Sequence, residues 1–290
     1  MKNISNDVIR GCLIALLAVT VSVAAEPRQD NRWVPIFDGK TLDGWTPKFR
    51  GFPAGVNYAD TFRVEDGVIS ASYDEYDTFD GRFGHLFFKT PYSHYRLRFE
   101  YRIHGEPAAD IPVWAFRNSG VMIHSLCPAA IPDERDFPTS LEFQTLAEAG
   151  EIEPRTTGNL CTPGTDVVYK GEFDETHCID SSSPALEAGR WVSAEMLVLG
   201  EQKIVHFVNG EKVLEYEHPT YGGPGSPSFE SLPIEDGQPA AGGYISLQAE
   251  GHPVQFRNIE LMDLAGPWTA MESYCPSADG KPLPGVSQSK

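Results

Sequence analysis

The sequence predicts an all-β protein, a sandwich or jelly roll built from antiparallel sheets. Several segments alternate apolar and polar residues with a period of two, which is the spacing of a half-buried strand. Turn sequences such as Asp66-Gly67 and Asn209-Gly210 divide some of these segments, and no stretch of the 290 residues has a convincing helical period. The 27 glycines and 23 prolines also indicate many turns and few long helices.

Segment 94–103 is the clearest predicted strand, because its aromatic and aliphatic residues fall on one face and its arginines on the other. In chain order, we expect a hairpin at 63–70, strands at 94–103, 116–125, 140–146 and 191–199, and a hairpin at 204–216. Segments 244–250 and 254–262 are expected to pair with each other across Gly251-His252-Pro253.

Two long segments interrupt this succession of strands, at 147–189 and 217–243. Loops of this length in a compact domain are usually functional or disordered. The first holds two cysteines and is expected to be ordered, whereas the second is rich in glycine and proline. Residues 266–290 are expected to form a loose C-terminal tail.

The N-terminus has the layout of a secretory signal peptide over residues 1–25. Lys2 and Arg10 precede an apolar run that ends in small residues, with cleavage expected near Ala24 or Ala25. A retained membrane anchor is the alternative, although the apolar run is short for a membrane span. The sequence therefore predicts an exported protein, periplasmic or extracellular, with one jelly-roll domain at 26–265 and no stable membrane insertion after cleavage.

The net charge of −18 restricts the possible partners. A chain this acidic repels nucleic acids and anionic membranes, so neither is an expected partner. Neutral and cationic ligands remain compatible with this charge.

The cysteines indicate disulfide bonds in an exported chain. Cys12 lies in the targeting segment, and Cys127, Cys161, Cys178 and Cys275 form an even set that allows three pairings. We expect Cys161 to pair with Cys178, because both lie in the same long segment and a disulfide would stabilise it. The pairing of the other two remains open.

Alternation places polar side chains together on two predicted strands. Glu142 and Gln144 lie two residues apart and share a face, and Gln248 and Glu250 repeat the arrangement late in the chain. The intervening residues Phe143, Ile245, Leu247 and Ala249 are expected in the core. The pattern alone is also compatible with a solvated outer face.

His124 is the most unusual residue of the predicted strand at 116–125. Alternation puts it on the same face as Met122 and Gly120, while Val121 and Ile123 take the core face. A lone histidine in a strand is usually structural or exposed, so a packed strand residue is the alternative to a site residue.

Four motifs, in this order along the chain, are similar to a known family. They are IFDGKTLDGW (36–45), RNSGVMIHS (117–125), LEFQ (141–144) and the closing GGYISLQAEGHPVQFRNIELMDL (242–264). With them, the chain resembles the 3-keto-disaccharide hydrolase family over residues 33–264. The segment TGNLCTPGT (157–165) resembles the branch of the family that also carries the histidine of the MIHS motif.

The resemblance implies a concanavalin/laminin-G-like jelly-roll sandwich of two curved antiparallel sheets. It also implies an enzyme acting on sugars already oxidised at C3, by elimination or hydration across C1–C2. A 3-keto group acidifies the C2 proton, so a base can remove it, an enediolate forms, and the C1 substituent leaves. Such a site needs a base near C2, a donor or cation for the enediolate, and an acid for the leaving oxygen.

Together with this chemistry, the resemblance suggests roles for individual residues. His124 and Glu142 are the expected acid–base pair. The expected substrate contacts are Asn118, Gln144, Gln248, Glu250 and Arg257, with Arg155, Asn159 and His177 in a segment that forms a lid or rim. For His85 a structural position at the start of a strand is favoured.

A divalent metal is compatible with enediolate chemistry, with His124 and Glu142 as two ligands. No HExxH or EF-hand spacing demands one, and a structural calcium in a loop is an equal alternative. A non-catalytic carbohydrate-binding module of the same fold is the rival function, and Trp45, Trp114 and Trp191 are its candidate stacking residues. An ordinary glycosidase is disfavoured because the closely spaced carboxylates of an ExDxxE strand are missing.

Overall fold

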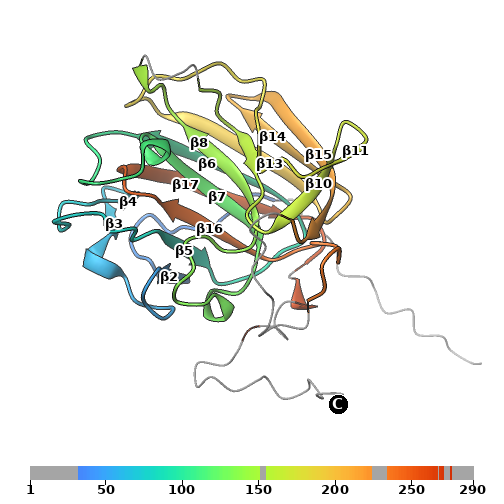
Figure 1. The fold of residues 1–290 in the computed structure, drawn as a ribbon, viewed down its shortest axis with the longest axis horizontal. Coiled ribbons are helices and arrows are strands. Elements are labelled where there is room, and N and C mark those ends of the chain that lie inside the picture. The colour runs from blue at the N-terminus through green and yellow to red at the C-terminus, as the bar shows by residue number, and fades with distance from the viewer. Residues whose placement is uncertain (1–31, 151–154, 224–233, 267, 271–274, 276–290) are drawn as a thin grey trace, which may run out of the picture.

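The computed structural model describes residues 32–150, 155–223, 234–266, 268–270 and 275. The predicted signal peptide at 1–25 and most of the predicted tail at 266–290 lie outside the described residues. Two antiparallel sheets pack face to face, as the sequence predicted (Figure 1). None of the described residues forms a helix long and apolar enough to cross a membrane.

The larger sheet has ten strands. Their order across the sheet is β11 (Glu172–Asp174), β10 (Thr165–Tyr169), β15 (Glu211–Tyr221), β14 (Lys203–Val208), β13 (Val192–Leu199), β6 (His94–Ile103), β17 (Val254–Asp263), β4 (Val68–Ala71) and β3 (Phe62–Glu65), and β1 (Val34–Pro35) also pairs with β17. The expected hairpins at 63–70 and 204–216 are confirmed as β3–β4 and β14–β15. Both central residues of each turn have positive φ, as a two-residue hairpin turn requires.

The smaller sheet has seven strands. Their order is β12 (Cys178–Ile179), β9 (Asn159–Cys161), β8 (Leu141–Leu146), β7 (Asn118–Ser125), β16 (Tyr244–Ala249), β5 (Gly84–Phe88) and β2 (Trp45–Phe49). The expected strands at 116–125 and 140–146 are β7 and β8, which pair with each other.

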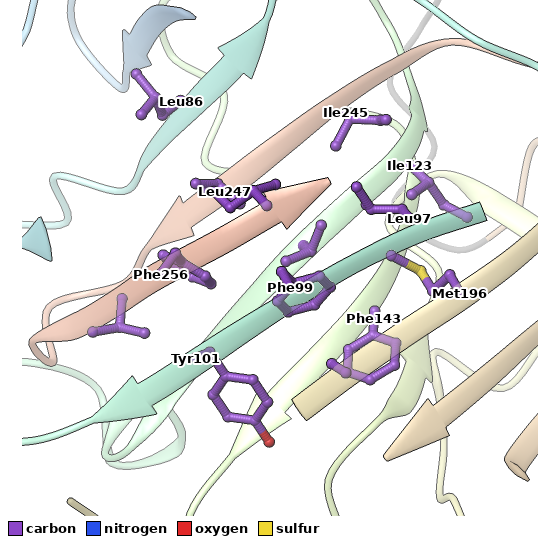
Figure 2. Packing of buried hydrophobic residues seen from close by; sticks show 14 of the residues in the cluster. Leu86, Leu97, Phe99, Tyr101, Ile123, Phe143, Met196, Ile245, Leu247 and Phe256 are labelled. Carbon is purple, nitrogen blue, oxygen red and sulfur yellow. The ribbon is translucent and has the colours of Figure 1, made fainter. Parts of the chain in front are cut away.

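The core lies between the two sheets. The alternation of β6 is confirmed, because its apolar side chains are buried while those between them are partly exposed. Phe99 lies at the centre of this layer, with its ring centroid 5.7 Å from that of Phe143 on the opposite sheet and 6.3 Å from that of Phe256 (Figure 2). Phe143 and Leu247 are buried there, as their positions between polar residues predicted.

The expected pairing of segments 244–250 and 254–262 is wrong. The first becomes β16 of the seven-stranded sheet and the second becomes β17 of the ten-stranded sheet, so the connection between them crosses from one sheet to the other. Gly251 turns this corner with φ +96°, and its amide donates to the Tyr73 hydroxyl at 2.8 Å. Both strands have an apolar face to bury, and this arch places the two faces against the same core.

The segment at 147–189 contains more strand than expected. Strands β9, β10, β11 and β12 all lie within it. Strands β10 and β11 extend an edge of the ten-stranded sheet, and β9 and β12 extend an edge of the seven-stranded sheet. The structure contains the expected Cys161–Cys178 disulfide, which links the paired strands β9 and β12. It also joins Cys127 to Cys275, the pair that the sequence left open.

Candidate active site

The outer face of the seven-stranded sheet gathers polar side chains from four neighbouring strands. Glu142 of β8 pairs with Met122 of β7, which pairs in turn with Ser246 of β16. Because residues two apart on a strand share a face, Gln248 lies on this same outer face, and its partner on β5 is His85. Continued by two further residues, the β16–β7 register puts Glu250 opposite Asn118. The expectation that Glu142, Gln144, Gln248 and Glu250 lie on one surface is therefore confirmed.

Gly120 allows the Glu142 side chain to lie across β7. A Cβ atom on Gly120 would come within 2.2 Å of Glu142 Oε1 and 2.7 Å of its Cγ. The carboxyl group thus occupies the space that any other residue at position 120 would fill with its side chain. The Glu142 side chain therefore points towards β16, where its charge raises the pKa of Glu250.

Glu142 and Glu250 form a buried carboxyl pair. Burial raises the pKa of Glu142 to about 8, and burial together with the neighbouring charge of Glu142 raises the pKa of Glu250 well above its usual range. Within the described residues, neither carboxyl group makes an ion pair with a lysine or arginine that would offset these effects. Such a pair retains protons at neutral pH and releases them in two linked steps that belong to the pair as a whole.

Several buried polar atoms around this pair have no hydrogen-bond partner in the part of the chain that the structure describes. They are Glu142 Oε1, Glu250 Oε2, Asn118 Oδ1, His85 Nε2 and both amide atoms of Gln248. An unsatisfied buried polar group costs about 1–3 kcal/mol, so a cluster of them indicates a place for a polar ligand. Donors, acceptors and an acid pair converge here, which suits a hydroxylated molecule such as a sugar.

His85 belongs to this cluster, although the sequence favoured a purely structural position for it. Burial, with a smaller effect of nearby Lys48, lowers its pKa to about 3, so the imidazole is neutral at pH 7. The ring packs edge-on against Phe137 at 6.0 Å. A neutral imidazole can donate or accept one hydrogen bond to a ligand. Only the pairing with Gln248 across β5 and β16 reveals this position, and no sequence spacing signals it.

Gln144 and Asn159 lie beside the carboxyl pair and bind each other. The two residues are paired on β8 and β9, and Asn159 Nδ2 donates to Gln144 Oε1 at 3.1 Å. Asn159 Oδ1 also accepts from the backbone amide of Ser181 at 2.9 Å. These contacts hold Gln144 at the edge of the polar cluster.

His124 does not lie with Glu142, so the expected acid–base pair is not formed. The β7–β16 register shifts between Tyr244 and Ser246, and His124 in this bulge has φ +51°. The irregularity breaks the alternation that would put it beside Met122. Its Nε2 lies 3.1 Å from the Gly200 carbonyl oxygen, and burial lowers its pKa to about 4.

Arg257 lies on the opposite side of the sandwich, so the expectation that it contacts ligand with Gln248 is wrong. It projects from β17 on the outer face of the ten-stranded sheet, where its Nε donates to Glu100 at 2.6 Å. Its guanidinium group also lies 4.0 Å from the centre of the Trp191 ring. The error follows from the crossing between β16 and β17.

The two remaining residues of the predicted rim contact the backbone of other segments. Arg155 donates to the backbone carbonyl of Phe116, two residues before Asn118. His177 is exposed, and its backbone carbonyl accepts from the Thr162 amide at 2.8 Å.

His124 and Glu142, the two ligands named for a possible divalent metal, are not brought together, because the His124 imidazole binds the Gly200 carbonyl oxygen. Among the residues that the structure describes, no group of three or more histidine, cysteine, aspartate or glutamate side chains is arranged to hold a metal ion.

A protein-family model covers the part of the chain that holds this site. The model of the 3-keto-alpha-glucoside-1,2-lyase-like domain matches residues 32–262. The chain belongs to this family. The lyase-like domain therefore includes β2 to β16 and nearly all of β17, and with them every residue of the polar cluster. Membership in it assigns the protein a carbohydrate-related function.

Several solved structures are similar to the chain at low sequence identity. A protein of unknown function with a galectin-like fold from Bacillus subtilis has a TM-score of 0.50 and 11% identity, covering 80% of this chain and 94% of that one. A proposed glycosyl hydrolase from Parabacteroides distasonis has a TM-score of 0.48 and 21% identity over 81% and 100% of the two chains. The carbohydrate-binding module CBM66 of Bacillus subtilis has a TM-score of 0.43 and 8% identity over 76% and 96%. No curated protein sequence matches the chain.

Proposed function

We propose that the protein is an exported enzyme that cleaves 3-keto-glycosides by β-elimination across C1–C2, and that it hydrates the resulting 2-hydroxy-3-keto-glucal. The observation that carries this proposal is the buried Glu142–Glu250 pair, with both pKa values raised and unpartnered amide and imidazole groups beside it. The substrate is an oxidised sugar, and the two steps together amount to hydrolysis.

In the elimination step, ionised Glu142 removes the C2 proton, which the 3-keto group makes acidic. The electrons of the C2–H bond form the C1–C2 double bond, and the C1–O bond breaks. Glu250 gives its proton to the leaving oxygen. Both carboxyl groups are buried with raised pKa values, so one can act as the base when it is ionised while the other acts as the protonated acid.

The hydration step runs the same proton transfers in reverse. Water adds its oxygen to C1 and gives a proton to ionised Glu250, while Glu142 returns its proton to C2. The carboxyl pair is thereby restored after the two steps. Gln248 Nε2 and neutral His85 Nε2 can donate hydrogen bonds to the oxygens of the enediolate, where charge develops, and Asn118 Oδ1 can accept one from a sugar hydroxyl.

An ordinary retaining glycosidase needs one carboxylate that is ionised at neutral pH to attack C1. In this pair both pKa values are raised, and Glu142 and Glu250 have no described cationic partner. A carboxyl group with a pKa near the working pH can take up and release a proton in turn, so the arrangement suits proton transfer better than attack by a carboxylate that stays ionised.

The test compares 4-nitrophenyl 3-keto-glucoside with the unoxidised glucoside. We expect nitrophenol release from the oxidised substrate alone, and its loss in Glu142→Gln and in Glu250→Gln. Glu172→Gln is a matched control, because Glu172 is exposed on the edge strand β11. Release from the unoxidised glucoside would indicate a glycosidase. Binding without release from either compound would indicate a carbohydrate-binding module.

A further inference from the structure

An aromatic group borders the polar cluster, and the proposed reaction gives it no role so far. It consists of Phe83, Trp114 and Phe137. The Trp114 ring stacks on Phe83 with centroids 5.6 Å apart and an angle of 9° between the ring planes. Phe137 packs against both rings, at 5.0 Å from Phe83 and 6.2 Å from Trp114.

The group is attached to the site at two points. Phe83 lies two residues before His85, and Phe137 contacts the His85 ring. On the other side, Asn118 Nδ2 donates to the Trp114 carbonyl at 3.2 Å, while Asn118 Oδ1 is one of the unpartnered atoms of the cluster. Trp114 is therefore linked to two residues of the polar cluster, to Asn118 through its backbone carbonyl and to His85 through Phe137.

Trp114 differs from its neighbours in exposure. Phe83 is 5% exposed, whereas Trp114 is 49% exposed and the adjacent Val113 is 71% exposed. A short 3-10 turn (Val113–Ala115) holds the indole in place, with Ala115 fully buried beneath it. One ring face is thus supported by Phe83, and much of the remaining indole surface is open to solvent.

We infer that Trp114 is the platform on which the leaving group of the substrate stacks, and that it determines specificity for a sugar in that position. The inference rests on the proposed function, which places the oxidised sugar ring at the buried carboxyl pair and the amides. The exposed indole at the border of the site then faces the second sugar ring, on the other side of the C1–O bond. The C–H bonds on one face of a pyranose form an apolar surface that matches an indole face.

Binding measurements separate this role from catalysis. In the Glu142→Gln background, a 3-keto-disaccharide and methyl 3-keto-glucoside are titrated by calorimetry with and without Trp114→Ala. We expect Trp114→Ala to weaken disaccharide binding by about tenfold or more, and methyl glucoside binding by less than about twofold. The methyl compound has no second ring to lose.

Two further variants control for indirect effects. Trp114→Phe keeps an aromatic face and should retain most of the disaccharide affinity. Phe173→Ala removes an exposed aromatic ring from β11 of the other sheet and should change neither affinity. An equal loss for both ligands in Trp114→Ala, or a loss for neither, would overturn the inference. If the unsubstituted enzyme turns over no 3-keto-glycoside but the selective loss of disaccharide binding remains, the proposed function fails and the platform stands.

Discussion

At the scale of single residues, the site depends on two buried carboxyl groups, and no described lysine or arginine forms an ion pair with either of them. Glu142 lies in β8 and Glu250 directly follows β16, more than one hundred positions later in the chain, and the sheet register puts both on one outer face. Burial then raises both pKa values. The residue types alone predict ordinary carboxyl groups, with pKa values of about 4 and a negative charge at neutral pH.

The pH dependence of the reaction tests the role of Glu142. The base must be ionised, and its pKa is raised to about 8, so kcat/KM should rise with pH up to that region. Glu142→Gln should lower the rate by about 10²- to 10⁴-fold and abolish this rise. An ascending limb near pH 6–7 would instead indicate a histidine base, and one near pH 4 an ordinary carboxylate.

Gly120 should be as sensitive as the carboxyl group that it accommodates. Gly120→Ala places a methyl group where Glu142 now lies, so the carboxyl group must move by an ångström or more. We expect kcat to fall by about 10²-fold while the fold is retained. In the Glu142→Gln background the same change should add little, because the group it displaces no longer acts. Independent losses in the double variant would contradict this account.

At the scale of elements, strands β9 and β12 support the site from the side. Cys161 of β9 pairs with Glu142 of β8, and the disulfide connects Cys161 to Cys178 of β12. The short strands of this edge have few backbone pairs of their own. The disulfide therefore stabilises the strand that flanks Glu142, the proposed catalytic base.

Loss of this disulfide should lower stability measurably. The two cysteines are 17 positions apart, and closing a loop of this size stabilises a protein by about 2–4 kcal/mol. Chemical unfolding of Cys161→Ser/Cys178→Ser should show a decrease of that order in the free energy of unfolding. An unchanged midpoint, or either thiol found free by peptide mapping without reductant, would refute the prediction.

At the scale of the whole molecule, buried titratable groups limit stability at both ends of the pH range. Burial lowers the pKa of His85 to about 3 and those of His124, His206 and His252 to about 4. As pH falls below about 6.5, the unfolded chain binds protons that these folded histidines do not, so stability falls. Glu142 and Glu250 act in the opposite direction, because the folded protein keeps protons that the unfolded chain loses above about pH 4.5.

Together these groups predict maximal stability near pH 6–7. Between pH 4.5 and 6.5 the four histidines outweigh the two carboxyl groups, and above pH 6.5 only the carboxyl groups still act, so stability declines towards pH 8. Thermal unfolding measured across pH 4–9 checks this expectation, and Glu142→Gln should reduce the decline on the alkaline side. A melting temperature that rises steadily from pH 6.5 to 8 would be inconsistent with it.

The sequence by itself determined the fold class, two hairpins, the disulfide of the 147–189 segment and the sharing of a face by Glu142 and Gln144. Each depends on local alternation, turn residues or a short separation along the chain, and the resemblance to a known family added the reaction. Only the tertiary structure decided that β16 and β17 belong to different sheets, which separates Arg257 from Gln248. It also decided that a bulge turns His124 away from Met122 and that Glu250 lies near Glu142. These features arise from pairing between distant segments, whose register and burial no single segment specifies.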